Sequence, residues 1–315
     1  MNCKKVLTYT NNGLKFHLYI KKGFAEQVFR LLKRIHNEKE YKMNRITPII
    51  LSGLLACLAA QAAVVLEFDA NDLALTGDAN ATSWVPSVNS NTGTKSMDIK
   101  FGAGSSVVTP TSSYFTRAVD SPNASSMESL DYHTATSGGT VDFSFELWVK
   151  MADLTGKHVL FETGGTTIGS ALTITDDVLD FRVNQSGSTV GYVTKTLTAL
   201  PSDFIQVVGV TDVSDGLSLY VNGTLAQTVT GLTITDWAGA NYAQLGGIDG
   251  NVAKPTDFTP TAFDGQVALA RFYDTALTAS DVGTIYSTTV PEPATLSLVA
   301  VFGGALILIR RRFKI

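Results

Sequence analysis

Cysteine is almost absent from this 315-residue chain, which contains only Cys3 and Cys57. The segment 63–290 has none, so disulfides, thiolate catalysis and cysteine-ligated zinc are excluded there. Basic residues are also scarce in this segment, with nine Lys and Arg against 24 Asp and Glu, a net charge of −15. Because nucleic-acid binding needs a positive surface to neutralise phosphates, we expect no nucleic-acid partner.

Motifs with a known catalytic mechanism are missing as well. The segment has no Gly-x-Ser-x-Gly elbow and no glycine-rich phosphate loop. Its two histidines, His133 and His158, belong to no metal-ligand or Ser/His/Asp pattern. The sequence therefore predicts a protein that is not an enzyme.

Two long apolar runs are present, one near each end. The C-terminal run "TLSLVAVFGGALILI" occupies 295–309 and carries no charge. As a helix it would extend about 22 Å, short of the roughly 30 Å hydrocarbon core, but including residues 293 and 294 makes spanning possible. A buried core helix is the alternative, although the basic residues of 310–314 favour a membrane span with its cytoplasmic side there.

The residues that flank this run form a pattern with it: Pro291, Glu292 and Pro293 before it, and Arg310, Arg311 and Arg312 after it. A Pro-Glu-Pro triplet, an apolar span and a basic end in this order resemble the PEP-CTERM sorting signal of Gram-negative bacteria. The resemblance covers 290–315, with the triplet at 291–293, the span at 294–309 and the basic end at 310–314. It implies a transmembrane sorting helix that an exosortase, a membrane-embedded protease, processes to release the protein to the cell surface or extracellular matrix.

The other apolar run predicts export through a signal peptide at 43–62. Its basic n-region contains Arg45, and its apolar region runs from about 46 to 60. Ala60-Gln61-Ala62 forms a small-x-small site, so signal peptidase would cut before Ala63. Leu54 to Cys57 also resembles a lipobox, but only about eight apolar residues precede it, and a sorting tail would make a lipid anchor redundant.

The first 42 residues differ from the acidic segment that follows, with ten Lys and Arg against three Glu. Within them, 24–35 has the pattern of a basic amphipathic helix. We interpret 1–42 as upstream sequence that a wrongly chosen start codon adds to the protein. An extended n-region of the signal peptide is the alternative.

Segment 63–289 alternates between apolar and polar residues in the way of β-strands. In "VDFSFELWVKM" over 141–151, one face is apolar and the other is polar except for Trp148, which predicts that the second face is covered or functional. The apolar face comprises Phe143, Phe145, Leu147 and Val149, and the polar face comprises Asp142, Ser144, Glu146 and Lys150.

Turn signals organise these strands into hairpins. Asn222-Gly223 separates two alternating runs and suits a type I′ turn, and Asp176-Asp177 predicts a second hairpin. Thr278 to Asp281 reads as a capping box that opens a single helix. Further strands are expected at Val64–Phe68, Met97–Phe101, Val159–Glu162, Val190–Lys195, Phe204–Thr211, Tyr242–Leu245 and Gln266–Tyr273. About ten short strands with little helix predict an all-β sandwich or jelly roll.

Four stretches in order strengthen this prediction: "VVLEFDANDLALTGDANATSW", "FSFELWVKM", "LSLYVNGTL" and "FDGQVALARFYDTALTASDVGTIY". Together they resemble the laminin-G-like (LamG-like), concanavalin A-like jelly roll of bacterial surface proteins, with the Asn-Gly hairpin and the run from Gly265 to Ile285 as landmarks. The resemblance implies a jelly-roll sandwich over 63–289. Such folds include lectins, adhesive modules, inactive spacers and glycoside hydrolases.

A glycoside hydrolase is the enzymatic alternative. Glu67-x-Asp69-x-x-Asp72 is close to the Glu-x-Asp-x-x-Glu strand of laminarinase-type hydrolases, but its last carboxylate is shortened. Retaining hydrolases need two carboxyl groups about 5–5.5 Å apart. Asp142 and Glu146 would lie about 13 Å apart along one strand face, which favours solvated or paired charges.

Binding residues are better candidates than catalytic ones. Trp237 and Tyr242 in "DWAGANYAQ" are candidates for a sugar-stacking platform, as is Trp148, although aromatic residues of a sandwich more often belong to its core. Members of the resembled family often bind calcium at the rim of the jelly roll. Here the loop "GGIDGNVAKPTDF" offers oxygen ligands from Asp249, Asn251 and Asp257, and an ordinary polar loop is the alternative.

These patterns and resemblances predict an exported, surface- or matrix-associated jelly-roll module without catalytic activity. It would bind a polysaccharide or act as an adhesive component, and its processing partners would be signal peptidase and an exosortase. A laminarinase-like hydrolase and a purely structural matrix component are the alternatives.

Overall fold

The computed structural model describes residues 5–11, 14–20, 62–75, 83–90, 97–102, 104–121, 124–126, 141–239, 242–247, 253, 259, 261 and 263–290. The chain divides into two compact units, Met1–Ala60 and Gln61–Ile315. In the first unit, β1 (Lys5–Asn11) pairs antiparallel with β2 (Leu14–Ile20), a hairpin that we did not predict. The predicted helix at 24–35, the apolar region of the signal peptide and the sorting tail all lie outside the described residues. Among the described residues, no helix has the length and apolar character to cross a membrane.

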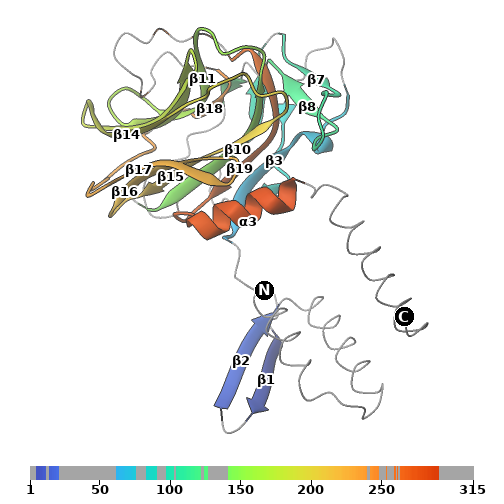
Figure 1. The fold of residues 1–315 in the computed structure, drawn as a ribbon, viewed down its shortest axis with the longest axis vertical. Coiled ribbons are helices and arrows are strands. Elements are labelled where there is room, and N and C mark those ends of the chain that lie inside the picture. The colour runs from blue at the N-terminus through green and yellow to red at the C-terminus, as the bar shows by residue number, and fades with distance from the viewer. Residues whose placement is uncertain are drawn as a thin grey trace, which may run out of the picture. The chain divides into compact units, whose positions relative to one another are not determined.

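The described residues of the second unit form a β-sandwich with one α-helix and one 3-10 helix (Figure 1). Its elements are β3 (Val64–Asp69), η1 (Ala70–Asp72), β4 (Ser83–Trp84), β5 (Val88–Asn89), β6 (Ile99–Phe101), β7 (Ser106–Val108), β8 (Ala118–Asp120), β9 (Ala124–Ser126), β10 (Phe143–Met151), β11 (Lys157–Gly164), β12 (Gly169–Thr175), β13 (Val178–Gln185), β14 (Ser188–Thr196), β15 (Ile205–Asp212), β16 (Gly216–Val221), β17 (Thr224–Thr230), β18 (Gln244–Leu245), β19 (Gly265–Tyr273) and α3 (Ala279–Thr289). The all-β sandwich expected from the sequence is confirmed.

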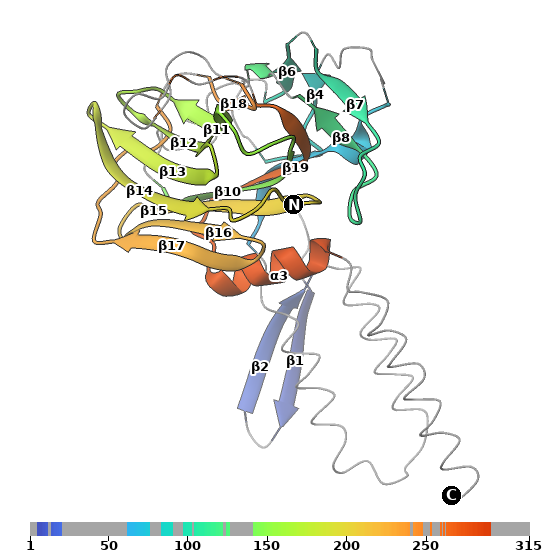
Figure 2. The same cartoon turned by 45° about the horizontal axis from the view of Figure 1, so that its top comes forward.

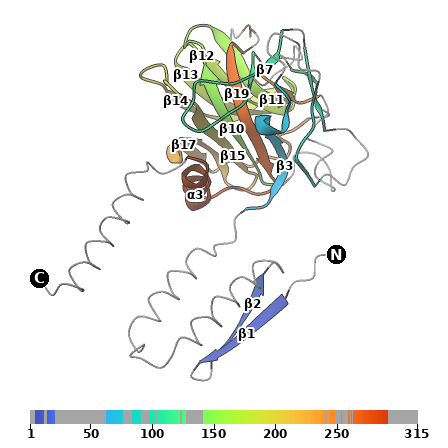
Figure 3. The ribbon, with the colours of Figure 1, turned by 90° about the vertical axis from the view of Figure 1, so that its right-hand side faces the viewer.

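Two antiparallel sheets form the layers of the sandwich. The nine-stranded sheet has the order β17-β16-β15-β10-β19-β3-β5, with β7 and β8 beside β19. The five-stranded sheet has the order β14-β13-β12-β11-β18 and lies over it, while α3 lies on the opposite side of the nine-stranded sheet (Figure 2). β4, β6 and β9 form a separate three-stranded sheet. The central strands β10 and β19 run side by side through the nine-stranded sheet (Figure 3).

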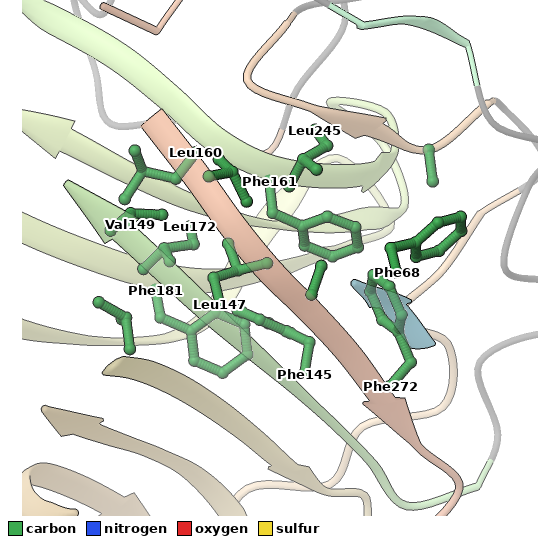
Figure 4. Packing of buried hydrophobic residues seen from close by; sticks show 14 of the residues in the cluster. Phe68, Phe145, Leu147, Val149, Leu160, Phe161, Leu172, Phe181, Leu245 and Phe272 are labelled. Carbon is green, nitrogen blue, oxygen red and sulfur yellow. The ribbon is translucent and has the colours of Figure 1, made fainter. Parts of the chain in front are cut away.

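The core fills the space between the two sheets. The apolar face predicted for β10 is confirmed, since Phe143, Phe145, Leu147 and Val149 are all buried in the main hydrophobic cluster. Phe145 meets rings from the opposite sheet, with Phe161 at 4.9 Å and Phe181 at 5.1 Å between centroids (Figure 4). Edge-to-face and tilted ring pairs of this kind stabilise beyond simple burial, by about 0.5–1.5 kcal/mol each.

The outer face of the nine-stranded sheet is covered, which settles the role of Trp148. This side chain is fully buried and its ring lies parallel to Tyr286 of α3, 5.7 Å between centroids. The ring of Phe115 also contacts the indole, at 5.3 Å between centroids. Trp148 therefore belongs to a packed interface under α3 and the 111–116 loop, and the prediction that it presents a ligand platform is wrong.

Asp203 fixes the 111–116 loop over this face. Its carboxylate accepts hydrogen bonds from the backbone N–H of Ser113 (2.7 Å) and of Phe204 (2.8 Å). Burial alone would raise the pKa of Asp203, but hydrogen bonds from Ser112, Ser113 and Phe204 outweigh burial and lower it.

Local signals in the sequence place the turns and the helix correctly. Asn222 (φ 50°) and Gly223 (φ 74°) have the left-handed backbone of a type I′ turn between β16 and β17. Glycine is also required at 223 for space, because a Cβ there would lie 2.9 Å from the Cβ of Tyr286. Thr278 caps α3 in a capping box with Asp281, as predicted.

Candidate functional site

The carboxylates of the predicted hydrolase motif have structural partners. Glu67 on β3 accepts a hydrogen bond from Arg271 Nε to its Oε2 at 2.6 Å, and Ser87 Oγ lies 3.2 Å from its Oε1. Asp69 caps the short helix η1 through Asn71 N at 2.8 Å, and burial raises its pKa. Asp72 lies exposed in η1. In this motif Glu67 therefore forms an ion pair, Asp69 caps η1 and Asp72 is exposed.

Arg271 also links Glu67 to the fully buried Glu146 of β10, whose Oε2 lies 3.6 Å from Arg271 Nη1. Besides this ion pair, Glu146 accepts three hydrogen bonds, from Trp148 Nε1 (2.7 Å) and Gln206 Nε2 (2.8 Å) to Oε1, and from Tyr273 OH (2.8 Å) to Oε2. This network joins four neighbouring strands beneath α3. The sequence predicted solvated or paired charges here, and Glu146 is paired.

The charges of this network, together with burial, change the pKa values of Tyr273 and Arg271. Burial and the Glu146 carboxylate raise the pKa of Tyr273. Burial alone would lower the pKa of Arg271, but Glu146 and Glu67 outweigh it, so that its pKa is raised and the guanidinium stays charged. Asp142, the other carboxylate considered on this strand, accepts a hydrogen bond from Val213 N at 3.1 Å. The network is therefore a structural link between strands.

The outer face of the five-stranded sheet is different, because polar side chains cross it from edge to edge. The strand register aligns Glu162 with Gln244 on one side and with Ala171 on the other, and Ala171 continues to Arg182 and then Tyr192. Their chain neighbours Phe161, Phe181, Val193 and Leu245 lie in the core, so these five residues point away from it. We call Gln244, Glu162, Ala171, Arg182 and Tyr192 the polar row.

Arg182 is the most constrained member of the polar row. Its Nε and Nη2 donate to the two carboxylate oxygens of Asp180, each at 2.8 Å, and both side chains are nearly buried. The guanidinium carbon lies 5.0 Å from the ring centroid of Tyr192, a cation–π contact. Nη1 reaches Thr189 Oγ1 at 3.5 Å, and Thr189 donates to Asn184 Oδ1 at 3.0 Å. A flexible side chain is thus held in one orientation.

Exposed tyrosines stand at both ends of the polar row. Tyr192 is 54% exposed, and Tyr242 is 47% exposed. Ala243 and Leu245 belong to the core, so Tyr242 lies on the same side of the chain as Gln244. With neighbouring strands about 4.8 Å apart, the row spans roughly 19 Å from β18 to β14. Between these exposed rings, Glu162 and Ala171 are fully buried, Gln244 is 3% exposed and Arg182 is 8% exposed, so the row is open to solvent mainly at its two ends.

Trp237, the other predicted stacking residue, is fully buried. Its ring stacks on Phe143 at 4.1 Å, and its Nε1 donates to Val141 O at 2.8 Å. The prediction that Trp237 forms a platform is therefore wrong, because the indole is part of the core. Of the three predicted aromatic residues, Tyr242 alone is available to a ligand.

The predicted calcium ligands Asp249, Asn251 and Asp257 lie outside the described residues. Within the described ranges, no group of three or more His, Cys, Asp or Glu side chains is placed to hold a metal ion. His158, which matched no motif, has Nδ1 3.0 Å from Thr261 Oγ1 and Nε2 2.9 Å from Thr155 O. It serves as a local hydrogen-bonding residue.

Sequence reasoning missed Asp180, Arg182 and Asn184, although a signal for them was present. In "LDFRVNQ" they alternate with Leu179, Phe181 and Val183, so that one face of β13 is polar from residue 180 to residue 184. A half-buried strand has the same pattern when its polar face only meets water. What distinguishes this strand is the near-complete burial of its polar residues, which depends on neighbouring strands.

Three solved structures are similar to this chain at low sequence identity, and the first of them has a TM-score that bears on the fold alone. The botulinum neurotoxin serotype G binding domain has a TM-score of 0.50 and 10% identity over 71% of this chain and 50% of that one. Domain 4 of AbnA, a GH43 extracellular arabinanase from Geobacillus stearothermophilus, solved with arabinotriose, has a TM-score of 0.48 and 15% identity over 72% of this chain and all of that one. The binding domain of Paraclostridial Mosquitocidal Protein 1 has a TM-score of 0.49 and 14% identity over 71% and 52%.

The chain spans about half the length of these toxin domains. No curated protein matches it in sequence. The Laminin_G_3 family model, described as the concanavalin A-like lectin/glucanases superfamily, matches residues 124–283, which is half of the chain. The chain belongs to the concanavalin A-like lectin/glucanases superfamily.

Proposed function

We propose that the sandwich is a non-catalytic carbohydrate-binding module and that the exposed rings of Tyr192 and Tyr242, at the two ends of the polar row, mark its binding face. Membership of a superfamily of lectins and glucanases favours a sugar ligand but leaves open where it binds and whether it is cleaved. The observation that carries the proposal is Arg182, held between Asp180 and Tyr192. A binding site built on a rigid sheet with fixed polar groups loses little entropy when a ligand binds.

The chemistry of the polar row suits an uncharged sugar chain. Arg182 has five N–H groups, of which three are used by Asp180 and Thr189, so two remain for hydroxyl oxygens at the small part of its side chain, 10%, that is exposed. Asp180 neutralises its charge, which removes the attraction for an anionic ligand. Tyr192 and Tyr242 offer the apolar ring surface on which sugar rings stack, and a span of roughly 19 Å accommodates several sugar units.

The contacts of Glu67 and Asp69 argue against hydrolysis at these residues. Arg271 holds Glu67, and Asp69 caps η1, so neither carboxylate is left to act as nucleophile or acid. A reducing-sugar assay on β-glucans tests this alternative. Sugar release that disappears in Glu67→Gln, with the fold retained, would establish the hydrolase.

Binding is tested with the full-length chain on a glycan array, followed by calorimetry on the glycans that respond. Tyr192→Ala and Tyr242→Ala should each weaken binding roughly tenfold, the equivalent of about 1.4 kcal/mol. Leu200→Ala, which removes an exposed apolar side chain from outside the row, is the matched control and should leave affinity unchanged. If no glycan binds, the purely structural alternative is favoured.

We also propose that the module is exported, with signal peptidase cutting after Ala62 and an exosortase processing the tail from Pro291 onward. The support is the order of sequence signals at both ends. Cell fractionation with mass spectrometry of the mature ends tests this. Recovery of the chain from the cytosol with residues 1–62 attached would contradict it.

A further inference from the structure

The edge strands of the two sheets differ in length, charge and backbone hydrogen bonding. β5 and β18 are only two residues long, which makes an edge a poor template for pairing. β14 is long, but it carries Lys195, and its Thr194 N–H donates to Gln227 Oε1 at 2.6 Å. β17 is the remaining long edge. Among the described residues, its backbone hydrogen-bonds only with β16.

β17 also lacks the charges that normally protect such an edge. No Asp, Glu, Lys or Arg occurs between Asp215 and Asp236, the longest uncharged run of segment 63–290. Every side chain of β17 is exposed or half-buried, and Leu225 is 45% exposed. An uncharged, proline-free edge strand is a template for another strand. A bulge opposite Leu219 and Tyr220 leaves the part from Gln227 to Thr230 as the regular edge.

We propose that two copies of this protein pair through β17, antiparallel across a two-fold axis, so that the nine-stranded sheet continues from one molecule into the next. The charge distribution places a contact between copies at β17 rather than elsewhere on the surface. Two segments of net charge −15 repel each other, and β17 is the long edge of the sandwich at which two copies can meet without opposing like charges. Two identical strands that pair antiparallel can also satisfy each other's backbone groups, since the N–H and C=O groups of each strand bond to the C=O and N–H groups of the other.

The pairing edge and the polar row belong to different sheets. β17 lies at the edge of the nine-stranded sheet (Figure 2), while the polar row crosses the five-stranded sheet, whose edge strand β14 contacts β17 through Thr194 and Gln227. A dimer would therefore present two polar rows, and two linked sites hold a repeating polymer more tightly than one. The pairing itself depends only on β17 and stands whether or not the polar row binds sugar.

The test uses full-length chain in mild detergent, with the protein mass measured by light scattering after gel filtration. Thr224→Lys/Thr230→Lys places two cations on β17, and Thr224→Glu/Thr230→Glu places two anions there. Thr196→Lys/Thr198→Lys, at exposed threonines outside β17, is the matched control. Wild type and control should be dimers, and each β17 variant alone should have half that mass.

A one-to-one mixture of the lysine and glutamate variants should recover the dimer mass, which also shows that both variants are folded. A wild-type protein that stays monomeric at high concentration would overturn the proposal, as would lysine variants that keep the wild-type mass. The second result would place the contact elsewhere, for example in the apolar C-terminal run.

Discussion

Glu67→Gln separates a structural carboxylate from a catalytic one. In the structure, Glu67 accepts a 2.6 Å hydrogen bond from Arg271, and both side chains are about one-fifth exposed. The substitution keeps the shape but replaces a charge-assisted hydrogen bond by a neutral one. Hydrogen bonds to charged groups contribute about 1.5–3 kcal/mol, so we expect the free energy of unfolding to fall by about 2 kcal/mol.

Arg271→Met should lower the free energy of unfolding more than Glu67→Gln does, because of the contacts that Arg271 makes. Arg271 is the cation beside both Glu67 and the fully buried Glu146. Without it, the charge of Glu146 is supported only by the neutral donors Trp148, Gln206 and Tyr273. Removing one partner of a buried charge pair costs about 3–5 kcal/mol, so Arg271→Met should be clearly less stable than Glu67→Gln.

Urea unfolding of the full-length variants, followed by tryptophan fluorescence, measures both changes. All three tryptophans are fully buried, and Trp148 donates directly to Glu146, so the signal reports on this region. Equal stability of wild type and both variants would refute the reasoning. A Glu67→Gln protein that is fully stable but has lost a sugar-releasing activity of the wild type would refute it in favour of the hydrolase.

Three further outcomes follow from the packing. Gly223→Ala should destabilise by about 2–4 kcal/mol, through its left-handed backbone and its clash with Tyr286, and Tyr286→Ala in the same chain should relieve the clash in a double-mutant cycle. Trp237→Ala should cost about 3–5 kcal/mol and leave glycan affinity of the folded protein unchanged, because the ring is buried on Phe143. Because the pKa of Asp203 is lower in the folded protein, its ionised carboxylate stabilises the fold at pH values above the ordinary pKa of 3.8. This stabilisation is lost as the pH falls through the lowered pKa. The difference in melting temperature between wild type and Asp203→Asn should therefore be largest near neutral pH and should shrink in acid.

Local sequence patterns predicted those parts of the fold that local physics determines. The alternation of β10, the Asn222-Gly223 turn and the Thr278 cap depend on neighbours within a few residues, and all three are confirmed. The site was harder to predict because burial depends on distant segments. Trp237 and Tyr242 are five residues apart in one polar stretch, yet one stacks in the core and the other is exposed.

Charges show the same limit. Nothing near Glu146 in the sequence indicates that Arg271, Gln206 and Tyr273 from other strands surround it. Likewise, the alternation of Asp180, Arg182 and Asn184 is visible in the sequence, but their enclosure by strands on both sides is not. A single sequence thus indicates on which face of a strand a residue lies. The structure is needed to show which other segments cover that face.

The pairing of β3 with β19 has a consequence for how the protein acquires its structure. Leu66 lies opposite Phe272, so the first strand of the sandwich is completed by a strand about two hundred positions later. β3 can pair earlier with β5, and β10 with β15, but β19 is the strand that joins β3 to β10. The larger sheet therefore closes only when nearly the whole polypeptide is available.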